Sequence, residues 1–118
     1  MRELLITLIP LLCQVESNNN ARAIGDSGRA VGILQIHLSV LKDIERIYGI
    51  TYRPEERFNP KISRMICYKY LLHWGRHYER KTGKRVTKEV LCKIWNGGPF
   101  GYRKPGAEMY WQKVKDLM

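Results

Sequence analysis

An apolar segment over residues 4–15 ends in the pair Glu16-Ser17, and a glycine-punctuated polar run follows it. The apolar segment predicts a helix over residues 2–16, which Pro10 either kinks or restarts. The run over residues 17–32 is rich in turn-forming residues, so it predicts irregular structure with a small hairpin around residues 25–28. An acid held against apolar surroundings is costly to ionise. We therefore expect a raised pKa for Glu16 and a proton that it can donate near neutral pH.

The segments after this loop predict further helices. The apolar spacing over residues 33–48 is helical, and Gly49 is suited to cap its C-terminus. Asn59-Pro60 predicts the start of a helix that ends before Gly83, because Asn is a good N-cap and Pro suits the first helical position.

Two shorter helices complete the chain. Thr87 is suited to be the N-cap of a helix that runs through Trp95. A glycine-rich loop follows at residues 96–101, and we expect the last helix to cover residues 106–117. The expected fold class is α+β and predominantly α, with a small glycine-rich β/loop excursion. The length suits a single domain, residues 1–118.

The charge of the chain indicates the kind of partner it meets. A net charge of +10, from 21 Lys and Arg against 11 Asp and Glu, predicts affinity for a polyanion such as nucleic acid, a bacterial wall polymer or anionic lipid. A solubility charge is the plainer interpretation. No basic recognition helix with a matching motif is present, so a specific nucleic-acid module is disfavoured. Both nucleotide-binding glycine motifs, GxxxxGK[ST] and GxGxxG, are absent.

The cysteines and histidines do not suggest a metal site. Cys13, Cys67 and Cys92 form no CxxC pair and lie in apolar stretches, so we expect three buried thiols and no disulfide framework. His73 and His77 are four residues apart on a predicted helix, where a solvated pair is the expected arrangement. We expect no metal and no cofactor.

The motifs resemble those of the lysozyme superfamily. Glu16-Ser17, Gly25-Asp26-Ser27-Gly28 and Gly32-Ile33-Leu34-Gln35-Ile36 look like the catalytic segment of lytic transglycosylases and goose-type lysozymes. The loop Asn96-Gly97-Gly98-Pro99 and the following Tyr110-Trp111 resemble invertebrate-type lysozymes. The matches together cover nearly the whole chain, and they imply a lysozyme-like fold acting on peptidoglycan.

The resemblance assigns roles to individual residues. It implies that Glu16 is the general acid and that Gln35 contacts the sugar chain near the cleaved bond. It further implies that Asn96 and Gly97 contact sugar substituents, that Trp95 stacks on a sugar face, and that the Tyr110 hydroxyl holds the Glu16 carboxyl. Core packing is the alternative for Trp95 and Tyr110.

Asp26 decides which reaction is expected. With Asp26 as a second acid, the chain is a muramidase that hydrolyses the β-1,4 bond between N-acetylmuramic acid and N-acetylglucosamine, and this is our main prediction. Without it, the chain is a lytic transglycosylase that gives 1,6-anhydro products. A turn-forming Asp26 with no chemical role is also open, as is a non-catalytic binder of wall glycan.

The resemblance also implies where the chain acts. We expect a monomer on the glycan strands of the anionic bacterial wall, with no transmembrane segment. No signal peptide is recognisable at the N-terminus, so delivery by a phage, release by lysis or export by another route is expected.

Overall fold

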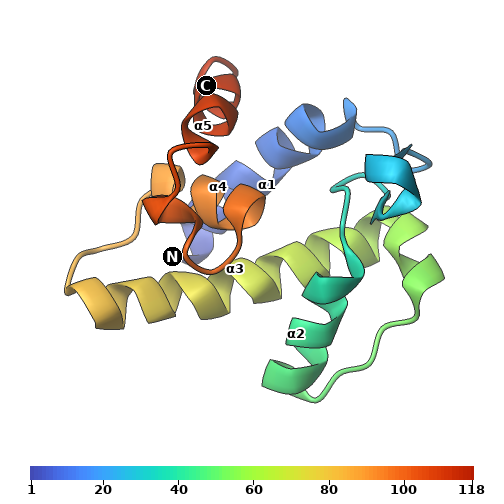
Figure 1. Ribbon diagram of the computed structural model, residues 1–118, viewed down its shortest axis with the longest axis horizontal. Coiled ribbons are helices and arrows are strands. Elements are labelled where there is room, and N and C mark those ends of the chain that lie inside the picture. The colour runs from blue at the N-terminus through green and yellow to red at the C-terminus, as the bar shows by residue number, and fades with distance from the viewer. The chain divides into compact units, whose positions relative to one another are not determined.

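The computed structural model describes all 118 residues. The elements in chain order are α1 (Arg2–Ser17), β1 (Ile24–Gly25), η1 (Asp26–Gly28), β2 (Ala30–Val31), α2 (Leu38–Tyr48), η2 (Pro54–Phe58), α3 (Pro60–Thr82), α4 (Lys88–Gly97), η3 (Gly101–Arg103) and α5 (Ala107–Lys115). This confirms an α+β class that is predominantly α (Figure 1). The chain forms two units, one of Cys13–Tyr70 and one of Met1–Leu12 with Leu71–Met118. We call them the hairpin unit and the α4–α5 unit.

Helix α1 runs through Pro10 as a single element. Proline has no N–H, so the carbonyl of Ile6 receives no bond from it. Both Ile6 and Pro10 are exposed, and water can therefore satisfy that carbonyl. The predicted helix is confirmed, and it extends one residue further than expected, to Ser17.

The hairpin predicted after α1 is present in the hairpin unit. Strands β1 and β2 are antiparallel, with Ile24 opposite Val31 and Gly25 opposite Ala30. The single turn of η1 joins them, and its Asp26 and Ser27 have positive φ angles of 49° and 57°. Asp and Ser tolerate this strained turn better than bulky residues do.

The helix predicted over residues 33–48 begins later than expected, at Leu38. Gly32 and Gln35 have positive φ angles of 87° and 52°, which a right-handed helix cannot contain. Val31 and Ile36 instead exchange backbone hydrogen bonds of 3.2 and 3.0 Å across a turn. The apolar residues of this turn are buried. Their spacing in the sequence matched that of a helix, and the predicted helix therefore began too early. Gly49 caps the C-terminus of α2 as predicted, with φ 70°.

Helix α3 starts where the sequence predicts. The Asn59 side-chain Oδ1 accepts hydrogen bonds from the N–H groups of Lys61, at 2.9 Å, and Ile62, at 3.1 Å. Pro60 occupies the first helical position, where a missing N–H costs nothing. The helix ends before Gly83, whose φ is 70°.

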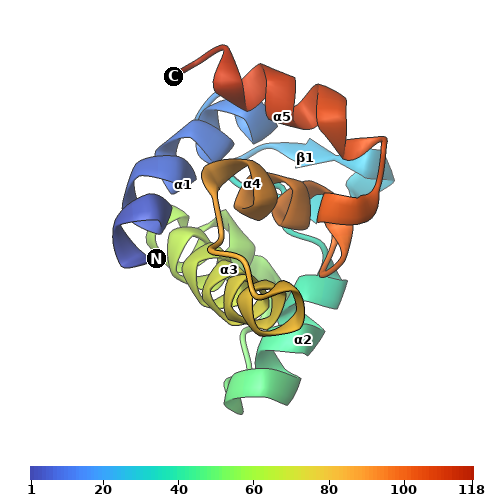
Figure 2. The same cartoon turned by 90° about the vertical axis from the view of Figure 1, so that its left-hand side faces the viewer.

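In the α4–α5 unit, α4 lies between the C-terminal half of α3 and α5 (Figures 1 and 2). Gly75 of α3 allows a close approach, since a Cβ there would lie 3.0 Å from the Leu91 side chain of α4. Lys93 of α4 is bonded to Glu89 at 2.6 Å and to Glu108 of α5 at 2.7 Å. These hydrogen bonds, that to Glu108 first, raise the pKa of Lys93.

The two histidines of α3 belong to an aromatic cluster. The rings of His73 and His77 stand edge-on to the Trp74 ring, with centroids 4.7 and 5.3 Å away. His77 also meets Phe100, at 5.7 Å. The expectation of a solvated histidine pair is therefore wrong, because both rings are half-buried among aromatic neighbours.

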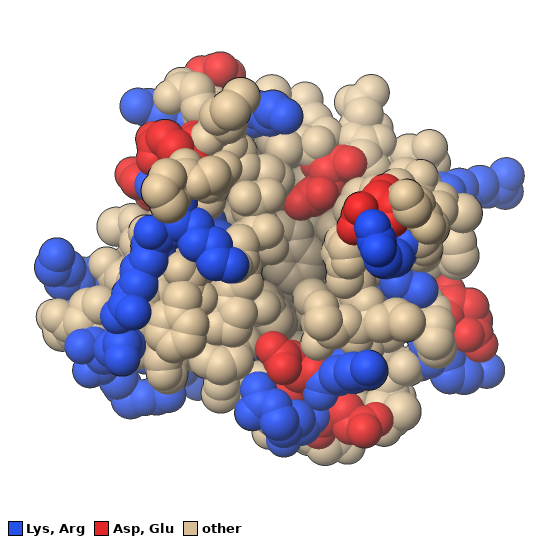
Figure 3. All heavy atoms as spheres, in the orientation of Figure 1, with Lys and Arg blue, Asp and Glu red and all other residues tan.

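Exposed basic side chains gather at the end of α3. Figure 3 shows Lys and Arg side chains where the C-terminal end of this helix lies, and the exposed residues here are Arg76, Arg80, Lys81, Lys84 and Arg85. We call this group the basic patch. None of the helices combines the length and apolar character needed to cross a bilayer.

Candidate active site

Glu16 lies in the last turn of α1 and is half-buried, in the hairpin unit. The neighbouring Ser17 fixes this helix end to the loop that follows. Its hydroxyl donates a 2.8 Å hydrogen bond to the carbonyl of Ile33 and accepts one of 3.0 Å from the N–H of Asn20. The Glu16 backbone is thereby held at a defined place beside the Gly32–Ile36 turn. The expected shift of the Glu16 pKa stays a prediction.

The surroundings of Glu16 include two buried thiols. Burial raises the pKa of Cys13, and the Glu16 charge adds a smaller contribution in the same direction. Burial likewise raises the pKa of Cys67 well above its ordinary value, and Glu16 contributes again. Both thiols are fully buried. The Glu16 carboxyl therefore lies near two buried thiols, and the Arg64 side chain, which bonds Cys13, lies in the same region.

Asp26 lies in the hairpin turn beside two basic side chains. Its carboxylate accepts a 3.1 Å hydrogen bond from Arg29 Nη2, and His37 Nε2 lies 3.4 Å from its other oxygen. The Asp26 side chain is 49% exposed. Both oxygens of the carboxylate therefore lie beside basic side chains of the same unit. These contacts favour a structural role in the turn.

Gln35 is not on a helix, contrary to the prediction. Its side-chain Nε2 donates to the carbonyls of Ala23, at 3.2 Å, and Gly32, at 3.0 Å. Its Oε1 occupies the space where a Cβ on Gly25 would stand. Gln35 therefore braces the hairpin against the turn. Contact with a sugar chain stays a prediction.

The other predicted site residues belong to the α4–α5 unit. Trp95 is half-buried, Asn96 is exposed and Gly97 is the last residue of α4. The Gly97 carbonyl accepts a 2.7 Å hydrogen bond from Lys104 Nζ, which ties the helix end to the loop beyond. Tyr110 is half-buried on α5.

Gly101 explains why the loop after α4 needs a glycine. A Cβ at this position would collide with the backbone carbonyl of Lys93, so only glycine lets the loop lie against α4. The loop is thereby held beside Asn96 and Gly97. Roles of these residues in sugar binding stay predictions.

Sequence reasoning missed Arg57. It is a buried arginine, 8% exposed, that bonds the carbonyls of Pro54 at 2.8 Å, Ile36 at 2.8 Å and Arg29 at 3.2 Å. Its own carbonyl lies where a Cβ on Gly32 would stand. No sequence signal marks it, because arginine is ordinarily a surface residue.

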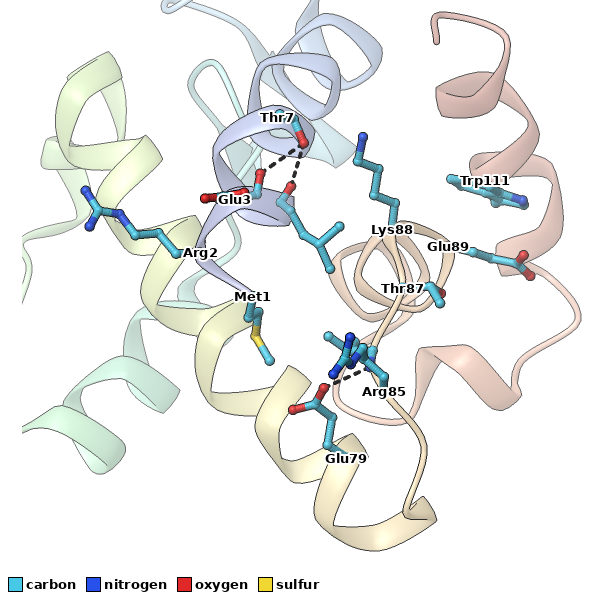
Figure 4. A pocket seen from close by; sticks show the side chains of 12 residues that line it. Met1, Arg2, Glu3, Thr7, Glu79, Arg85, Thr87, Lys88, Glu89 and Trp111 are labelled. Atoms are coloured by element: carbon cyan, nitrogen blue, oxygen red, sulfur yellow. Dashed lines mark hydrogen bonds between the residues drawn. The ribbon is translucent and has the colours of Figure 1, made fainter.

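A cavity of about 1110 Å³ lies elsewhere in the α4–α5 unit (Figure 4). The start of α1, the end of α3, the start of α4 and Trp111 line it. Its charged side chains are mixed in sign and are Arg2, Glu3, Glu79, Arg85, Lys88 and Glu89. None of the predicted site residues lines it. No group of three or more His, Cys, Asp or Glu side chains forms a possible metal site.

The comparison with protein families gives one match. The model of the transglycosylase SLT domain matches residues 1–117. No curated protein and no solved structure matches the chain significantly.

Proposed function

The chain belongs to the transglycosylase SLT domain family, and from this premise we propose that it is a lytic transglycosylase acting on peptidoglycan. The observation that carries the proposal is a family match over nearly the whole chain. It supports the transglycosylase alternative above the hydrolysis that was our main prediction.

The proposed mechanism needs one protein acid. Glu16 gives its proton to the glycosidic oxygen as the bond from that oxygen to C1 of the muramic acid breaks. The sugar's own acetamido oxygen bonds to C1 and holds the positive charge. The 6-hydroxyl then attacks C1, the acetamido bond breaks, and the Glu16 carboxylate takes back the hydroxyl proton. The products are a 1,6-anhydro end and a free sugar hydroxyl, and no water is consumed.

The contacts of Asp26 support this chemistry. A retaining hydrolase needs a second carboxylate free to reach C1, and an inverting one needs a carboxylate free to activate water. Asp26 is instead bonded to Arg29 and close to His37. In the proposed reaction Asp26 has no chemical step to perform, and it stabilises the hairpin turn.

Mass spectrometry of digested cell-wall sacculi tests the proposal. We expect muropeptides one water lighter than hydrolysis products, with no reducing ends. Glu16→Gln should abolish their release, whereas Asp26→Asn should keep most of it. Glu3→Gln, at the exposed start of the same helix, is the matched control and should be fully active.

The other outcomes identify the alternatives. Products with reducing ends, lost in Asp26→Asn, would establish a muramidase. Binding to sacculi without any turnover would establish a non-catalytic glycan binder.

A further inference from the structure

A second cavity lies within the hairpin unit, between the hairpin and the start of α2. Its volume is about 310 Å³, and its walls are Gly28, Arg29, His37, Leu38, Ser39 and Arg57. The charged groups on these walls are two arginines, with a histidine beside them. No acidic side chain lines the cavity, in contrast to the mixed walls of the larger one in the α4–α5 unit.

Arg57 is the unusual member of this set. Burying a guanidinium is costly unless a carboxylate or another acceptor compensates it. All of its protein partners are backbone carbonyls, and they bond Nε and Nη1. Its Nη2 has no acceptor in the protein, and burial lowers the pKa of the group. The protein thus holds a largely buried guanidinium on a cavity wall, and no carboxylate pairs with it.

The remaining residues that line the cavity add further hydrogen-bond donors. Leu38 and Ser39 begin α2, where N–H groups have no acceptor within the helix. The N-cap His37 makes no capping hydrogen bond with its side chain. Arg29 and His37 share the nearby Asp26 carboxylate, which neutralises one of the two arginines. The cavity therefore keeps one uncompensated positive charge when His37 is neutral.

We propose that this cavity binds a carboxylate of the peptide carried by the muramic acid of the glycan strand. The proposal rests on the proposed function for the identity of the polymer. The planar fork of arginine matches a carboxylate, as it does a phosphate. A single uncompensated charge suits a singly charged carboxylate better than a doubly charged phosphate. Arg29 and Arg57 would then act as specificity residues for strands that carry peptides.

Binding is tested in the Glu16→Gln protein by NMR titration. The probes are a synthetic stem tripeptide with free carboxylates, the same peptide fully amidated, and inorganic phosphate. We expect the free-acid peptide to shift the Leu38 and Ser39 amides and to bind most tightly. Amidation should weaken binding about tenfold, because a hydrogen-bonded charge is lost. Equal binding of the amidated peptide, or tighter binding of phosphate, would overturn the proposal.

Arg29→Gln tests the site without removing the structural bonds of Arg57. It should weaken binding of the free-acid peptide about tenfold. Arg46→Gln is the matched control, because Arg46 makes the same three-residue ion pair with Asp43, at 3.3 Å, away from the cavity. Equal affinities of the Arg29→Gln and Arg46→Gln proteins would contradict the proposal.

Activity separates this inference from the proposed function. With Glu16 in place, Arg29→Gln should slow cleavage of peptide-bearing sacculi and leave cleavage of peptide-free glycan strands unchanged. Anhydro products without peptide binding would refute the inference alone. Peptide binding without anhydro products would refute the proposed function alone.

Discussion

At the scale of the residue, two glycines of the Glu16–Gln35 segment are required for different structural reasons. Gly28 and Gly32 both have positive φ angles, of 89° and 87°. A Cβ on Gly28 would meet nothing within 4 Å, whereas a Cβ on Gly32 would collide with the Arg57 carbonyl. Gly28 is therefore needed for its backbone conformation alone, and Gly32 also for the close approach of Arg57.

This difference predicts unequal costs for the two alanine variants. Gly28→Ala should lower the free energy of unfolding by about 1 kcal/mol, the cost of a left-handed alanine. Gly32→Ala adds a backbone collision and should cost roughly 3 kcal/mol or more. Urea denaturation measures both. A Gly32→Ala protein that fails to fold while Gly28→Ala folds would agree with the prediction, and equal costs would contradict it.

At the scale of the element, the helices depend on their caps as well as on their apolar stripes. Helix α3 is the longest, with 23 residues, yet its first turn is fixed by one amide side chain. Thr87 acts similarly at α4, where its hydroxyl oxygen accepts a 3.2 Å hydrogen bond from the Val90 N–H. Caps of this kind are local in sequence, which is why both starts were predicted correctly.

Replacing the α3 cap should lower the stability of the protein. Asn59→Ala leaves the Lys61 and Ile62 N–H groups without their acceptor, so we expect a loss of about 1–2 kcal/mol in the free energy of unfolding. Asn59→Asp keeps an acceptor oxygen and is the control, with an expected change of a few tenths of a kcal/mol. Equal losses in the two variants would show that the hydrogen bonds of the cap are not what stabilises the helix.

At the scale of the whole molecule, the net charge of +10 is the property that bears on an anionic wall. The basic patch concentrates part of this charge on the end of α3, where Figure 3 shows it exposed. Lys81 and Arg103 also lie over the exposed Phe100 ring, 5.9 and 5.3 Å from its centroid. A cationic surface attracts a polyanion over distances set by the ionic strength.

Binding to sacculi should therefore weaken as salt rises. We expect retention of the Glu16→Gln protein to fall between about 50 mM and about 500 mM NaCl, as the screening length shortens. Binding to uncharged chitin should change little over the same range. Exchanging Lys81 and Lys84 for serine should lower retention on sacculi more than exchanging Lys42 and Lys61, two exposed lysines outside the patch. Salt-independent retention would show that charge does not bring the protein to the wall.

The sequence by itself determined the features that depend on near neighbours in the chain. Helix caps, the hairpin, the burial of the cysteines and the position of Glu16 at a helix end follow from residue types at short spacing, and the structure has them. It also carried the resemblance to the lysozyme superfamily, and the match to the transglycosylase SLT domain agrees with that resemblance.

Only the tertiary structure decided the features that need distant partners. The turn at Gly32–Ile36 replaces a predicted helical start because Arg57, more than twenty residues away in sequence, fills the space beside Gly32 and bonds the Ile36 carbonyl. Arg57 also lines the cavity beside the start of α2. The Asp26 carboxylate is bonded to Arg29 and lies close to His37. The spacing of apolar residues cannot predict such contacts. It indicates which side chains are buried, but it does not indicate which distant groups will bond the backbone N–H and C=O groups.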